Sequence, residues 1–125
     1  MEIGKIGKGE VIVSEENTAD RAGSGLLPVY ATPNMVALIE NTASRSVAGD
    51  LEEGQGTVGL YIEVEHLQPT PIGRKITCQT VLTEIDRKKL IFKAEVYDET
   101  GLVGRGIHHR FIIDNKKFME KASKR

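Results

Sequence analysis

The apolar positions between residues 32 and 48 recur at steps of three and four, which is the spacing of one face of an α-helix. They are Val36, Ile39, Ala43 and Val47. Thr32 suits the N-cap and Pro33 the first helical position, so the pattern predicts a helix from about Pro33 to Ala48. Glu40 adjoins this apolar stripe, where a carboxylate is costly unless it has a partner or a chemical task.

The rest of the chain shows the two-residue alternation that is typical of half-buried strands. A first strand is expected within Gly9 to Thr18, followed by a loop over Asp20 to Pro28. Four longer strands follow the helix, and the alternation assigns these residues to the inward faces: Val58, Leu60, Ile62, Val64 and His66; Ile76, Cys78 and Leu82; Leu90, Phe92, Ala94 and Val96; Val103, Ile107, Phe111 and Ile113.

One helix followed by four long antiparallel strands needs an arrangement in which the helix covers one face of the sheet. We therefore expect an α+β fold in which an antiparallel sheet of about five strands wraps around one long central helix. The chain has 125 residues and no internal repeat, so residues 1–125 are expected to form a single domain.

Charge and cysteine content narrow the classes of function. With 17 basic and 18 acidic residues the net charge is -1, which gives no reason to expect nucleic acid or an anionic membrane as a partner. Cys78 is the only cysteine, and no run is long enough for a membrane span or a signal peptide, so a cytoplasmic protein is expected. The basic residues after position 115 are interpreted as a solvated tail, with a phosphate-contacting tail as the alternative.

Three polar residues are candidates for chemistry because of where they fall. Glu40 flanks the buried stripe, Thr32 begins the helix whose N-terminus favours negative charge, and His66 closes an otherwise apolar strand face. Each also has a structural interpretation, as a surface carboxylate, a helix cap or a core histidine. No spaced cluster of His, Asp or Glu ligands is visible, so neither a metal nor another cofactor is expected.

Several segments of the chain together form a recognisable pattern: Val29-Tyr30-Ala31-Thr32, Met35-Val36-Ala37-Leu38-Ile39-Glu40, Glu53-Gly54-Gln55-Gly56-Thr57-Val58-Gly59, His66, Thr70-Pro71-Ile72-Gly73 and Gly104-Arg105-Gly106-Ile107-His108-His109-Arg110. In these segments the chain resembles the fluoroacetyl-CoA thioesterase-like family of hotdog-fold thioesterases. The resemblance implies a hotdog fold, a catalytic set of Thr32, Glu40 and His66, and an acyl-site glycine at Gly59. In this family pattern a histidine also stands at His108, outside the catalytic set.

The resemblance also implies an activity, the hydrolysis of a short- or medium-chain acyl thioester carried by coenzyme A or an acyl carrier. Glu40 would act as nucleophile or general base, His66 would move the proton, and Thr32 would orient the attacking group or attack itself. Gly59 and the helix N-terminus could supply oxyanion donors. A hotdog dehydratase and a non-catalytic acyl-CoA binder remain open as alternatives.

Two further expectations concern the substrate pocket and assembly. Residues 22–28 contain none of the aromatic residues that cover the acyl pocket in the fluoroacetate-specific member of the family, so a pocket mouth around Leu26, Leu27 and Tyr30 should admit non-fluorinated chains. Hotdog proteins pair edge to edge with the active site between subunits, so a homodimer or a higher homo-oligomer is expected.

Overall fold

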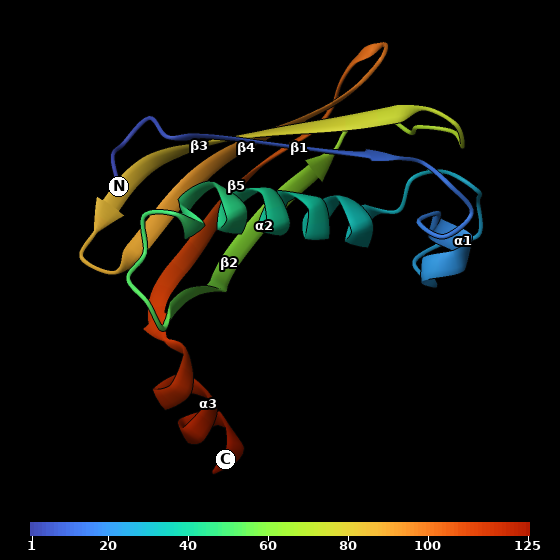
Figure 1. The fold of residues 1–125 in the computed structure, drawn as a ribbon. Helices are drawn as coiled ribbons and strands as arrows, with labels where there is room; N and C mark the ends of the chain where they lie inside the picture. The colour runs from blue at the N-terminus through green and yellow to red at the C-terminus, as the bar shows by residue number, and fades with distance from the viewer.

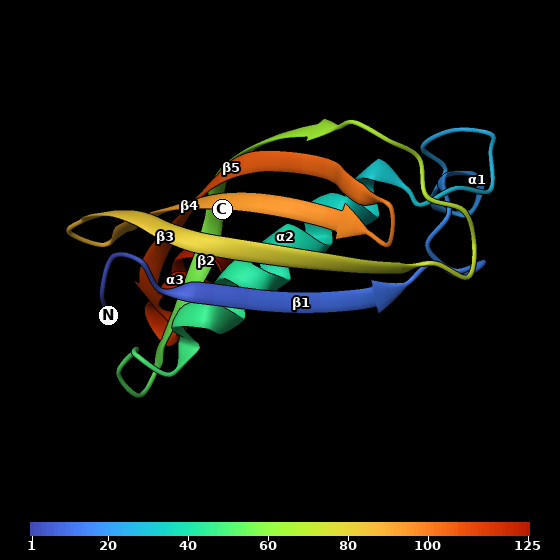
Figure 2. The ribbon, with the colours of Figure 1, turned by 90° about the horizontal axis from the view of Figure 1, so that it is seen from above.

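Five antiparallel strands curl around one long helix in the computed structural model, which describes residues 1–125 (Figure 1). The elements are β1 Ile6–Ile12, α1 Ala19–Ala22, α2 Thr32–Ala48, β2 Gln55–His66, β3 Lys75–Asp86, β4 Lys89–Asp98, β5 Gly101–Asp114 and α3 Asn115–Ser123. The strand order is β1-β3-β4-β5-β2, and α2 runs beneath the curved sheet (Figure 2). This confirms the predicted α+β architecture with a central helix.

Helix α2 buries the face that the sequence pattern predicted, with small changes. Its buried residues are Met35, Ile39, Thr42, Ala43 and Val47, and Val36 is only half-buried. The predicted N-cap is wrong: Ala31 occupies that position, and Thr32 is the first helical residue. The Thr32 hydroxyl makes no capping bond because it is engaged with His66 instead.

The core lies between α2 and the inward faces of β3 and β4. Ile76 and Leu82 of β3 are fully buried, as are all four inward residues predicted for β4, Leu90, Phe92, Ala94 and Val96. A tight turn at Gly101, whose φ of 136° suits glycine, leads from β4 to β5 as expected. Regular alternation on these strands made this part of the fold predictable.

Strand β2 departs from the predicted alternation because of a bulge. Its register with β5 shifts between Gly59 and Tyr61, so one residue is left over. Leu60, predicted to point inward, is 56% exposed. Before the bulge the inward face belongs to Thr57 and Gly59 in place of Val58; after it, Ile62, Val64 and His66 are half-buried on the core side as predicted.

The inward face of β5 was also predicted wrongly. Val103 is buried, but beyond it the buried positions are Gly104, His108 and Arg110, whereas Phe111 is 37% exposed. A register shift beside β4 between Val96 and Tyr97 accompanies the change of face. The pattern failed here because this stretch of the core is built from glycines and hydrogen-bonded polar side chains.

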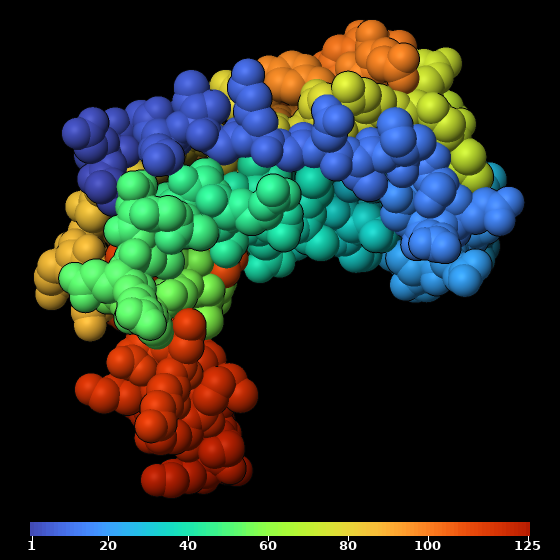
Figure 3. All heavy atoms as spheres, viewed as in Figure 1, coloured from blue at the N-terminus to red at the C-terminus, as the bar shows by residue number.

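The two ends of the chain differ from the sequence-based expectation as well. Strand β1 begins at Ile6 and ends at Ile12, and the expected loop after it contains the short helix α1. The C-terminal basic segment is exposed, but it forms α3, whose N-cap Asp114 accepts from the Lys117 N–H at 3.0 Å. Figure 3 shows this helix projecting from the body of the molecule. None of the helices is both long and apolar enough to cross a membrane.

Candidate active site

Thr32 and His66 meet at the N-terminal end of α2. The Thr32 hydroxyl lies 2.8 Å from Nδ1 of His66, which closes strand β2. The two residues are 34 positions apart in the sequence, so the contact depends on the long antiparallel strand that returns past the start of the helix. A hydroxyl hydrogen-bonded to an imidazole is the arrangement of an activated nucleophile.

Burial favours the neutral form of His66. Removal of the ring from water lowers the pKa of His66 below its ordinary value near 6.5, and a backbone contact to Gln68 opposes this in part. Nε2 is buried and has no hydrogen-bond partner. With the proton on Nε2, Nδ1 is free to accept from the Thr32 hydroxyl, as a general base requires.

A hollow of about 320 Å³ opens beside this pair. Thr32, His66 and Tyr30 line it together with Ala19 of α1, the loop that follows α1 and the segment 67–69 that follows β2. Tyr30 is buried, and its hydroxyl donates to the Asn34 carbonyl at 3.2 Å. Leu27 is 65% exposed and does not line the hollow, so the structure brings Tyr30 but not Leu27 to this part of the candidate site.

Glu40 lies elsewhere on the same helix. It is eight positions after Thr32 on α2, about 12 Å along the axis at about 1.5 Å per residue, which is too far for a hydrogen bond within one protomer. Its carboxylate faces Gly59, where an added Cβ would lie 3.0 Å from Oε2. The three expected catalytic residues therefore form two groups, a Thr32 half-site (Tyr30, Thr32, His66) and a Glu40 half-site (Glu40, Gly59).

A buried polar cluster behind the Glu40 half-site was missed by the sequence analysis. Arg110 is only 7% exposed; its Nε donates to the Thr57 hydroxyl and its Nη2 to the Thr57 carbonyl, each at 2.8 Å. Its Nη1 lies 3.1 Å from Nε2 of His108 and 3.8 Å from Oε2 of Glu40. The sequence shows polar residues at alternate positions of this long strand, and this alternation could have indicated the cluster. We assigned those positions to the outward face of the sheet.

Backbone donors for an oxyanion are scarce at the N-terminus of α2. Pro33 has no N–H, and the N–H groups of Asn34 and Met35 both donate to the Ala31 carbonyl at 3.1 Å. We expected this helix end to stabilise the oxyanion, and only the Thr32 N–H is left there to do so. A donor from Gly59 stays a prediction.

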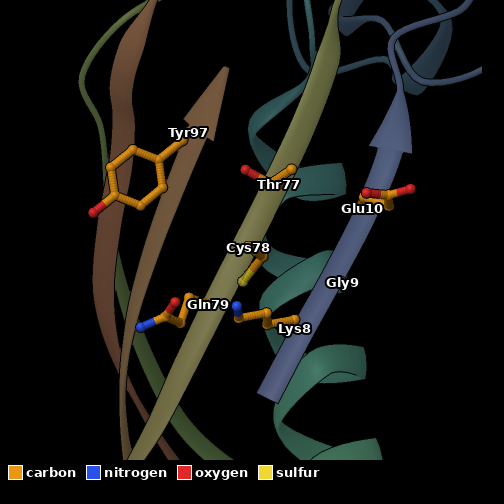
Figure 4. A pocket seen from close by; sticks show the side chains of 7 residues that line it. All are labelled: Lys8, Gly9, Glu10, Thr77, Cys78, Gln79 and Tyr97. Atoms are coloured by element: carbon orange, nitrogen blue, oxygen red, sulfur yellow. The ribbon is translucent and has the colours of Figure 1, made fainter. Parts of the chain in front are cut away.

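A second hollow, of about 400 Å³, lies on the opposite face of the sheet (Figure 4). Its lining residues are Lys8, Gly9, Glu10, Thr77, Cys78, Gln79 and Tyr97. Cys78 carries the only thiol among them, but it is 2% exposed, and burial raises the pKa of this thiol to about 11. This face therefore offers no activated nucleophile. No group of three or more His, Cys, Asp or Glu side chains is arranged to hold a metal ion.

The chain is similar to known proteins in both sequence and fold. A model of the family described as fluoroacetyl-CoA-specific thioesterase matches residues 13–116. The fluoroacetyl-CoA thioesterase of Streptantibioticus cattleyicolor is 34% identical over 94 residues, which are 75% of this chain and 68% of that protein.

Solved structures extend the likeness to the fold. A fluoroacetyl-CoA thioesterase structure superposes with a TM-score of 0.95 at 27% identity, covering 100% of this chain and 97% of that chain. A hot-dog-like protein of Thermanaerovibrio acidaminovorans superposes with a TM-score of 0.91 over 99% of this chain and 92% of its own. Its identity is 19%, so it supports the fold alone. The hotdog fold expected from the sequence is confirmed.

Proposed function

Because the chain belongs to the fluoroacetyl-CoA-specific thioesterase family, we propose that it hydrolyses a short- or medium-chain acyl-CoA to the free acid and coenzyme A. The observation that carries a mechanism is the contact of 2.8 Å between the Thr32 hydroxyl and His66. It supplies a nucleophile and its base beside a hollow large enough for an acyl group.

In the first half of the reaction, the Thr32 oxygen attacks the thioester carbonyl carbon while its proton passes to Nδ1 of His66. The tetrahedral oxyanion then collapses and the C–S bond breaks. Coenzyme A leaves as a thiol with the proton from His66. The acyl group is now an ester of Thr32.

In the second half, Glu40 takes a proton from a water molecule, and the resulting hydroxide attacks the ester carbonyl carbon. The bond to the Thr32 oxygen breaks, the free acid leaves, and the proton held by Glu40 returns to Thr32. The two half-sites thus serve successive steps, which requires them to face the same acyl group.

A homodimer satisfies that requirement. Strand β2 is an edge of the sheet, and sheet edges in proteins are commonly covered by another element or another chain. Leu60 and Tyr61 on this strand are 56% and 48% exposed, so a second protomer could cover them. Val36 lies midway between Thr32 and Glu40 on α2, and Ile62 lies about midway between Gly59 and His66 on β2. A two-fold axis near Val36 and Ile62 would therefore set the Thr32 half-site of one protomer opposite the Glu40 half-site of its partner.

The mechanism uses no metal ion or other cofactor, and coenzyme A enters only as part of the substrate. We also expect a cytoplasmic protein without a nucleic acid partner. These expectations stay predictions.

Thiol release from a panel of acyl-CoA substrates tests the proposal. The parent should release thiol from saturated acyl-CoA, and Glu40→Gln and His66→Ala should each lower kcat by about 10²-fold or more. A dehydratase would instead hydrate an enoyl-CoA without releasing thiol, and a binder would retain affinity without turnover. If Glu40→Gln hydrolyses acyl-CoA as fast as the parent, the role proposed for Glu40 is wrong.

A further inference from the structure

We propose that Arg110 is a positioning residue, locked by Thr57 and His108, that holds the Glu40 carboxylate where it can activate water. The inference rests on the proposed function, because it assigns Arg110 a part in the step that Glu40 performs. It begins from a charge that has almost no access to solvent, since Arg110 is 7% exposed.

A buried guanidinium is unfavourable unless hydrogen bonds and an opposite charge compensate for the lost water. The hydrogen-bond partners of Arg110 are the hydroxyl and carbonyl of Thr57 and the ring of His108, and all of them are neutral. The Glu40 carboxylate forms the one ion pair of Arg110, at 3.8 Å. Arg110 therefore has Glu40 as its counter-ion, and their positions depend on each other.

His108 fixes the direction in which Arg110 points. Its Nδ1 lies 2.9 Å from the Tyr61 carbonyl and must donate there, which leaves Nε2 to accept from Nη1 of Arg110 at 3.1 Å. Burial lowers the pKa of His108, so the ring stays neutral and keeps this acceptor. Nη1 carries two N–H bonds, and the second is available to Glu40.

Gly59 confines the carboxylate from the other side. A Cβ at this position would lie 3.0 Å from Oε2 of Glu40, 3.5 Å from Cε1 of His108 and 3.7 Å from Nη1 of Arg110. The strand backbone thus packs directly over the ion pair. The Glu40 side chain is still 42% exposed, so it is held on two sides and open on a third, where a water molecule can reach it.

Thr57 offers the mildest way to disturb this arrangement. Thr57→Val preserves shape and strand propensity but removes the hydroxyl that accepts from Nε of Arg110, whereas Thr57→Ser retains a hydroxyl. We expect Thr57→Val to lower kcat about three- to tenfold with KM nearly unchanged, and Thr57→Ser to stay within about twofold of the parent. Arg110→Lys keeps the charge without the forked geometry and should slow turnover at least as much as Thr57→Val.

The decisive experiment measures the effect of Thr57→Val on kcat in the Glu40→Gln variant. If Arg110 acts through Glu40, Thr57→Val costs nothing further there, because the step it supports is already lost. A loss that recurs in that background would overturn the proposal, as would a folded Thr57→Val protein with the parent's kcat. Full activity of Glu40→Gln alone would instead refute the proposed function.

Arg105→Gln is a matched control on the same strand. Arg105 pairs with Glu65 at 2.9 Å across the same two strands, but its side chain is 56% exposed. We expect its loss to leave kcat and KM unchanged, since exposed ion pairs contribute little.

Discussion

Two inactive variants should restore activity when they share a dimer. In the proposed arrangement each active site takes Thr32 and His66 from one protomer and Glu40 from its partner. A mixed dimer of Glu40→Gln and His66→Ala then contains one site with both changes and one site with neither. Random mixing makes half of the dimers mixed, so activity should return to about a quarter of the parent.

The background is low enough to make this visible. Each variant alone should have about one hundredth of the parent's rate or less, so mixing should raise thiol release at least about twentyfold. The two variants can be co-expressed with different tags and the mixed dimer purified through both, which raises the expected activity to about half of the parent per dimer.

A matched pair of variants gives the control. Thr32 and His66 hydrogen-bond within one protomer, so they belong to the same half-site. A mixed dimer of Thr32→Ala and His66→Ala therefore damages both sites and should remain inactive. No recovery in a purified Glu40→Gln/His66→Ala dimer would refute the composite site, and so would a monomeric mass for the parent in light scattering at micromolar concentration.

Three further predictions follow from the same structure. Thr32→Ser should keep much of the rate, whereas Thr32→Ala should lose about 10²-fold or more in kcat with little change in melting temperature, since Thr32 does not cap α2; a large loss of stability would contradict this. Acetyl-CoA and longer saturated acyl-CoA should be hydrolysed with kcat/KM similar to that of fluoroacetyl-CoA, because residues 22–28 include no aromatic side chain; a preference of several orders of magnitude for the fluorinated substrate would contradict it. Burial lowers the pKa of both His66 and His108 from about 6.5, so the unfolded chain binds protons at a higher pH than the folded protein does. The contribution of these two residues to the free energy of unfolding should therefore be fully present above about pH 6.5 and decline below it. Urea midpoints measured on both sides of that pH check the sign, and His108→Asn should flatten the decline.

The sequence predicted the parts of the fold whose inward faces are apolar and regular. Helix α2 and strands β3 and β4 follow their periodicities, and of the inward residues predicted for them only Val36 is not buried. The pattern missed the buried Met35 and Thr42 of α2. Strands β2 and β5 were misassigned because Gly59 begins a bulge and because His108 and Arg110 face inward. A pattern of hydrophobic positions cannot anticipate a bulge, and it assigns charged residues to the solvent, which is usually correct.

The candidate site was predictable as a set of residues but not as an arrangement. Family resemblance named Thr32, Glu40 and His66, yet nothing in the spacing indicated that Thr32 contacts His66 while Glu40 lies two turns away. Arg110 escaped notice because its role depends on Thr57, which lies 53 positions earlier and reaches it only across the β2–β5 pair.

The position of β2 in the strand order also bears on how the chain folds. Strands β3, β4 and β5 are joined by tight turns and can pair early, whereas β2 pairs only with β5, whose partner residues are roughly 40 to 60 positions away. On the same loop-closure argument we expect β2 to dock after these three strands have paired, as we expect of β1, whose partner residues on β3 lie roughly 60 to 75 positions away. Since β2 carries both Gly59 and His66, each half-site is completed only when β2 docks. Destabilising changes in β2 will then accelerate unfolding and leave the refolding rate almost unaltered.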